Sequence, residues 1–123
     1  MKLQDNLFKI LDKTCHNDAT IYKVLLLPNA EIYKAHFPNK PITPGVCIVQ
    51  IIIELLSNYL QQEYRLCGAK NIKFLQVIDP LKTQTINVEL KKIVNIDDSH
   101  ITFQALVSNE EVVFTKVSLK CKK

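Results

Sequence analysis

The chain has 123 residues, of which 47% are hydrophobic and 23% are charged, and its formal net charge is +4. These values predict one folded domain, residues 1–123, with enough apolar side chains for its own core. We expect no membrane insertion, because the longest apolar run, Val46–Ile53, contains a glutamine and is far shorter than a bilayer span. We expect no nucleic-acid partner either, because the basic residues are mostly scattered and are not interleaved with aromatic ones.

The four cysteines do not have the spacing of metal ligands. Each stands alone in an apolar stretch, which predicts free thiols in a reducing compartment, the cytoplasm. No ligand cluster and no glycine-rich phosphate loop is present, so we expect neither a metal nor another cofactor. The cysteines are Cys15, Cys47, Cys67 and Cys121.

The first part of the chain predicts a helix followed by a strand. Met1–Asp12 mixes charged residues with leucines at helical spacing, which favours an amphipathic helix over a signal peptide. A turn at His16–Asp18 then leads into a strand over Thr20–Leu27, which Pro28–Ala30 ends. Glu31–Ala35 leads into the next loop.

Residues 36–62 predict a stiff loop and one long helix. Pro38, Pro41 and Pro44 make the loop rigid and non-helical, and Pro44 lies where a proline is tolerated at a helix start. From Pro44 to Gln62 we predict a helix that is apolar around nearly all of its circumference, Val46 included. One narrow polar stripe interrupts it, formed by Gln50, Glu54, Ser57, Asn58 and Gln61.

Beyond Gly68 the pattern alternates as in an antiparallel sheet. We predict strands around Ile72–Val77, at Thr85–Lys91, at Ile101–Val107 and at Val112–Cys121. Five strands hide an apolar helix only if the sheet curls around it. The prediction is therefore an α+β protein of the hot-dog kind, and its open sheet edges favour a dimer.

The segment H-F-P-N-K-P-I-T-P-G-V resembles the active-site signature of the 3-hydroxyacyl-[acyl-carrier-protein] dehydratases, H-F-P-x-x-P-x-x-P-G-V-x-x-x-E. The positions that match are His36, Phe37, Pro38, Pro41, Pro44, Gly45 and Val46. The resemblance implies the hot-dog fold, with His36 as the base that removes a proton from the α-carbon of the acyl thioester. It implies that the N–H of Gly45 holds the thioester carbonyl, and that Phe37, Pro44 and Val46 line the substrate site.

The chain departs from this signature at Gln50, where the family has a carboxylate that protonates the departing hydroxyl. An amide has no titratable proton near neutral pH, but it still forms hydrogen bonds to the leaving oxygen or to a water. Two alternatives stay open: Gln50 is only part of the polar stripe, or Glu54, one helical turn later, replaces the acid through a water. We expect His16 and His100 on the surface and Cys47 in the core.

Three functions fit these residues. The first is a dehydratase acting on acyl thioesters carried by acyl carrier protein, as a homodimer or a higher oligomer of dimers, with each site shared between subunits. The second is a hot-dog thioesterase, and the third is a non-catalytic subunit that binds acyl chains. The intact histidine loop favours the dehydratase.

Overall fold

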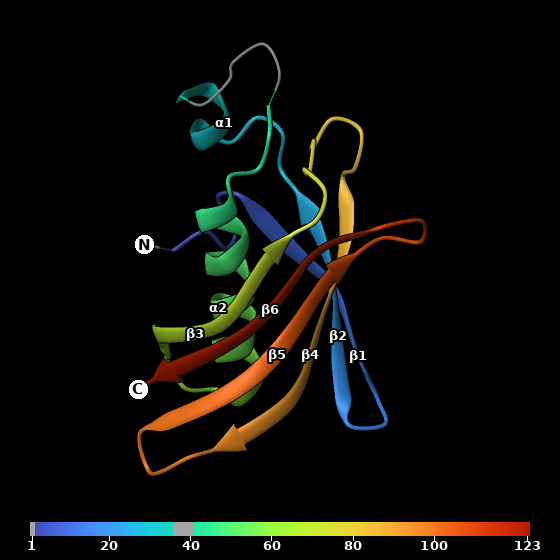
Figure 1. Cartoon of the computed structure of the whole chain (residues 1–123). Helices are drawn as coiled ribbons and strands as arrows, with labels where there is room; N and C mark the ends of the chain where they lie inside the picture. Colours follow the sequence, from blue (N-terminus) through green and yellow to red (C-terminus); the bar gives the residue numbers. More distant parts are fainter. Residues whose placement is uncertain (1, 36–40) are drawn as a thin grey trace.

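The computed structural model describes residues 2–35 and 41–123, whose arrangement is shown in Figure 1. Six strands form one antiparallel sheet in the order β1-β2-β4-β5-β6-β3, and the helix α2 (Gly45–Leu60) lies along its concave side (Figure 1). The strands are β1 (Phe8–His16), β2 (Ala19–Leu26), β3 (Arg65–Phe74), β4 (Thr85–Asn95), β5 (His100–Ser108) and β6 (Val113–Lys122). A short helix, α1 (Glu31–Ala35), lies beyond the N-terminal end of α2.

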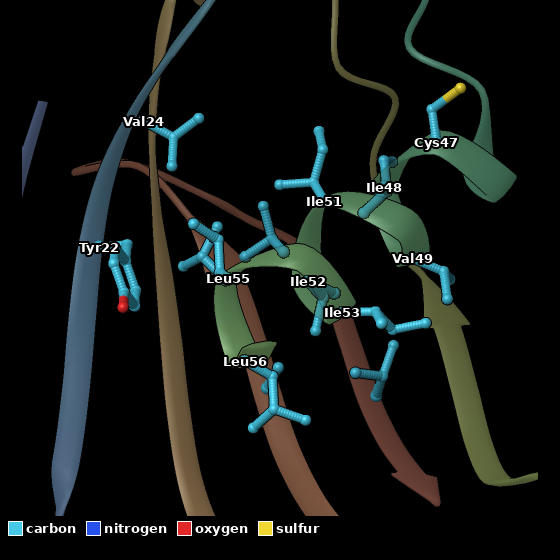
Figure 2. Close-up of a cluster of buried hydrophobic side chains, with 14 of the residues drawn as sticks. Tyr22, Val24, Cys47, Ile48, Val49, Ile51, Ile52, Ile53, Leu55 and Leu56 are labelled. Atoms are coloured by element: carbon cyan, nitrogen blue, oxygen red, sulfur yellow. The ribbon is translucent and has the colours of Figure 1, made fainter. Parts of the chain in front are cut away.

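The core lies between α2 and the inward-facing side chains of the sheet. The predicted alternation in β4 and β5 is confirmed, since Ile86, Val88 and Leu90 are buried in β4 and the odd-numbered residues from 101 to 107 are buried in β5. Figure 2 shows Tyr22 and Val24 of β2 facing the apolar side chains of α2. This one-sided burial is what a curled sheet around a helix requires.

The predicted central helix is confirmed within two residues at each end. Pro44 occupies the N-cap position with extended backbone angles, so the helix begins at Gly45. It ends at Leu60 because Gln61 takes the left-handed conformation, with φ of 53°. Val46 departs from the prediction: its side chain is 68% exposed, although Cys47 and Ile48 in the same turn are buried.

The predicted helix over Met1–Asp12 is wrong. Asp5 has φ of 68°, and the N–H groups of Asn6 and Leu7 fold back onto the carbonyl of Leu3 in a tight turn. β1 then pairs with β2 through the Asn17–Asp18 turn, where Asn17 has φ of 55°. Pairing with β2 outweighs the weak helical pattern, and the sheet has six strands instead of five.

The first strand after α2 also differs from the prediction. β3 begins at Arg65, before Gly68, and it ends at Phe74, so Val77 lies outside it. Nearly all of its side chains are exposed, because β3 lies at the edge of the sheet and pairs only with β6. Cys67 on this strand and Cys15 on β1 are exposed too, so the apolar surroundings predicted for the cysteines hold only for Cys47 and Cys121.

Within the described ranges, no helix has both the length and the apolar character needed to cross a membrane.

Candidate active site

An aromatic ring packs against Gly45, the first residue of α2. A Cβ atom added to Gly45 would lie 2.8 Å from Cζ of Phe74, the last residue of β3. A side chain at this position would require the ring of Phe74 to shift, so glycine permits the close approach seen here. The glycine of the signature therefore has a structural reason in this chain, and sequence analysis missed Phe74 as its partner.

The chain that enters α2 is fixed by two hydrogen bonds. The N–H of Thr43 donates to the carbonyl oxygen of Ile78 over 2.9 Å, and the hydroxyls of Thr43 and Tyr33 lie 2.7 Å apart. Both side chains are buried, and burial raises the pKa of Tyr33. Tyr33 belongs to α1, so this contact connects α1 to the residue that precedes Pro44 at the start of α2.

The first turn of α2 has no side-chain cap among the described residues. Cys47 and Ile48 both donate their N–H groups to the carbonyl of Pro44. The N–H groups of Gly45 and Val46 precede this first hydrogen-bonded turn. Together with the helix dipole, they form the kind of end that stabilises an anion or a polarised carbonyl oxygen.

Two predicted site residues, His36 and Phe37, lie outside the described residues. The structure does place Pro44, Gly45 and Val46 together at the helix start, and it places Gln50 on the second turn of α2. Cys47 is buried in the core as expected, and burial raises the pKa of its thiol, which disfavours the nucleophilic thiolate. His16 is exposed, and His100 is partly exposed and lies 2.9 Å from Asp97.

Gln50 lies in a pocket of about 450 Å³ along the polar stripe of α2. Its side-chain amide donates to Oε2 of Glu54 over 2.9 Å. The pocket is lined mainly by polar residues, namely Lys2, Gln4, Gln50, Ile53, Glu54, Ser57, Asn58, Gln61, Gln62, Glu63 and Tyr64.

Most of the polar stripe makes structural hydrogen bonds. The hydroxyl of Tyr22 donates to Asn58 over 2.7 Å, and the hydroxyl of Ser57 accepts from the N–H of Tyr64 over 3.1 Å. Glu54 accepts from the N-terminal segment, a contact that no local sequence pattern indicated. In the described part of the chain, no group of three or more His, Cys, Asp or Glu side chains is placed to hold a metal ion.

Solved structures define the class of fold. The dehydratase heterocomplex ApeI:P from Xenorhabdus doucetiae has a TM-score of 0.70 at 15% identity, over 93% of this chain and 96% of that one. A mutant of the thioesterase PA1618 from Pseudomonas aeruginosa has a TM-score of 0.61 at 10% identity, over 94% of this chain and 79% of that one. At such identities the likeness shows the fold alone, which is the predicted hot-dog fold.

A family model described as ApeI dehydratase, ApeI-like, matches residues 12–117. The chain belongs to the ApeI-like family of dehydratases.

Curated relatives agree with this family. The 3-hydroxyacyl-[acyl-carrier-protein] dehydratase FabZ of Oenococcus oeni is 32% identical over 80 residues, which is 58% of this chain and 58% of that protein. FabZ of Levilactobacillus brevis is 33% identical over 86 residues, which is 64% of this chain and 53% of that protein. The chain thus spans little more than half the length of these relatives.

Proposed function

We propose that this chain eliminates water from a 3-hydroxyacyl thioester carried by an acyl carrier protein and so forms the trans-2-enoyl thioester. The observation that carries the proposal is the uncapped start of α2 at Gly45, directly after the histidine loop that resembles the dehydratase signature. The family membership supports the reaction type, and the pocket beside Gln50 supplies room next to the helix.

In the proposed reaction, the thioester carbonyl accepts a hydrogen bond from the N–H of Gly45. The helix end stabilises the negative charge that develops on this oxygen when His36 takes the proton from C2. The C3–O bond then breaks, the C2–C3 double bond forms, and the imidazolium of His36 returns its proton to the departing hydroxyl as water. Gln50 contributes hydrogen bonding to the hydroxyl and no proton.

The surface of β3 and β6 supports an acidic carrier protein as partner. The two strands carry Arg65, Lys70, Lys73, Lys116, Lys120 and Lys122, and neither contains an acidic residue. Lys73 lies directly opposite Lys116, and Arg65 lies opposite Lys122. Like charges at opposed positions are unfavourable within a sheet, and an acidic partner relieves this repulsion.

A turnover assay of the purified protein alone, with a 3-hydroxyacyl carrier-protein thioester, tests the function. We expect enoyl thioester to form and the thioester bond to stay intact. Release of free carrier thiol would instead indicate a thioesterase. Tight binding of the acyl carrier without either product would indicate the non-catalytic acyl-binding subunit.

We further propose a homodimer formed along β3, in which each site combines His36 of one chain with Gln50 of the other. The free edge of β3 and the exposed apolar side chains of Leu66, Ile72 and Phe74 support this arrangement.

Light scattering should give the dimer mass for the wild type at micromolar concentration, and Ile72→Lys should shift the protein toward the monomer. Leu11→Lys is the matched control, because Leu11 is 51% exposed on β1 at the opposite edge. A monomeric wild type, or equal effects of the two substitutions, would contradict the β3 dimer.

A further inference from the structure

We infer that Glu54 is a positioning residue: its carboxylate fixes the orientation of the Gln50 side-chain amide, and the N-terminal segment Leu3–Gln4 in turn holds the carboxylate in place. The inference rests on the proposed function for its effect on turnover. Its geometry stands on four contacts of one carboxylate, each between 2.7 and 2.9 Å.

The contact between Gln50 and Glu54 selects one orientation of the amide. The Oε2 atom of Glu54 lies 2.9 Å from Nε2 of Gln50. An ionised carboxylate only accepts hydrogen bonds, so the NH₂ group of Gln50 must face Glu54 and the carbonyl oxygen must face away. The usual ambiguity between the two ends of a glutamine amide is therefore removed by chemistry.

The carboxylate is itself held by backbone groups. The N–H of Leu3 donates to both oxygens of Glu54, over 2.9 and 2.7 Å, and the N–H of Gln4 donates to Oε1 over 2.8 Å. Hydrogen bonds to an ionised group are stronger than neutral ones. With backbone N–H groups on both of its oxygens, Glu54 serves as an acceptor, which argues against its use as a replacement acid.

The segment that supplies these donors is also held in place. The side chains of Leu3 and Leu7 are buried, and the carbonyl of Leu3 accepts from Asn6 over 3.0 Å and from Leu7 over 2.7 Å. The tight turn thus links Glu54 to the buried core, and Glu54 in turn links Gln50 to that core. A group held by such a shell meets the substrate without the cost of reorientation.

Glu54→Gln tests this role, because it keeps the size of the side chain and removes the charge. A second amide offers either a donor or an acceptor to Gln50, so this contact no longer selects one orientation of the Gln50 amide. We expect kcat for dehydration to fall about tenfold, since small displacements of a positioned group cost up to about 10² in rate. KM should change less than about twofold, because the thioester is held at Gly45.

NMR of the side-chain amide of Gln50 gives a readout that needs no turnover. Its ¹⁵N–¹H₂ signals, assigned by their loss in Gln50→Glu, should move in Glu54→Gln and become broader. Tyr22→Phe is the matched control: it removes the 2.7 Å hydrogen bond to Asn58 on the same helix, so it should lower Tm without moving the Gln50 signals or kcat.

The outcomes separate this inference from the proposed function. Unchanged Gln50 signals in Glu54→Gln would overturn the positioning role, whether or not the protein turns over substrate. Moved signals with an unchanged kcat would overturn its importance for the reaction. A wild type without turnover would overturn the proposed function, while the NMR comparison would still decide whether Glu54 orients the amide.

Discussion

His36→Ala should lower the rate of dehydration by about 10²–10⁴-fold, which is the usual contribution of a general base. The fold should be unaffected, because the described end of the histidine loop is held by other residues. Thr43 binds Ile78 and Tyr33, and Pro41 is buried. Steady-state kinetics and thermal unfolding of the variant check both statements.

His100→Ala is the control for this experiment. His100 lies at the turn between β4 and β5, where it pairs with Asp97 over 2.9 Å, and it plays no part in the proposed site. We expect its loss to leave turnover unchanged. If His36→Ala kept full activity, the base would have to be another group, and the likeness of the loop to the dehydratase signature would concern structure only.

Gln50→Glu should raise the rate of dehydration by about tenfold or more, which corresponds to about 1.4 kcal/mol of barrier. The introduced carboxyl would lie beside Glu54, whose oxygens accept N–H groups of Leu3 and Gln4. Two adjacent carboxyls resist ionising together, which raises the pKa of the pair. The introduced group would therefore keep a proton nearer to neutral pH, as a general acid requires.

The two adjacent carboxyls in the Gln50→Glu variant also predict a change in its stability with pH. Above the ordinary glutamate pKa of about 4.3, the unfolded chain releases a proton that the folded variant retains. The unfolded state then binds fewer protons, so the free energy of unfolding of the variant falls relative to wild type as the pH rises from about 5 to about 8. Thermal unfolding of both proteins across this range measures the difference.

Adding Glu54→Gln to Gln50→Glu should remove this pH dependence, because only one carboxyl then remains at the contact. Two results for Gln50→Glu alone would contradict the expected rise in the rate of dehydration. An unchanged rate would show that Gln50 does not reach the substrate. A lost rate would show that the site is built around the amide.

The local sequence predicted the parts of the fold in which one pattern decides the structure. The polar stripe defined α2, and strict alternation defined β4 and β5, because burial on one face repeats within a few residues. β1 and β3 have mostly exposed side chains, so neither carries such a pattern. Their place in the sheet depends on pairing with β2 and β6, which no local segment contains.

The candidate-site residues Pro44, Gly45 and Gln50 were proposed because the proline loop resembles the dehydratase signature, and the structure places all three at the start or on the second turn of α2. The contacts that hold them come from distant segments: Phe74 covers Gly45, and Leu3 binds Glu54 across 51 positions of sequence. Such contacts follow from the assembled sheet, and single-sequence patterns do not contain them.

The order of strands also determines when the site is completed during synthesis. β3 follows α2 in the chain, but it pairs with β6, which the ribosome makes only after β4 and β5. Because synthesis adds about 5–20 residues per second, this delay lasts seconds. Until β6 emerges, Phe74 has no sheet to hold it over Gly45, and β3 is an unpaired strand. The ring of Phe74 can therefore take its place beside Gly45 only after β6 is made, and until then the backbone of β3 is free to pair with a strand of another chain.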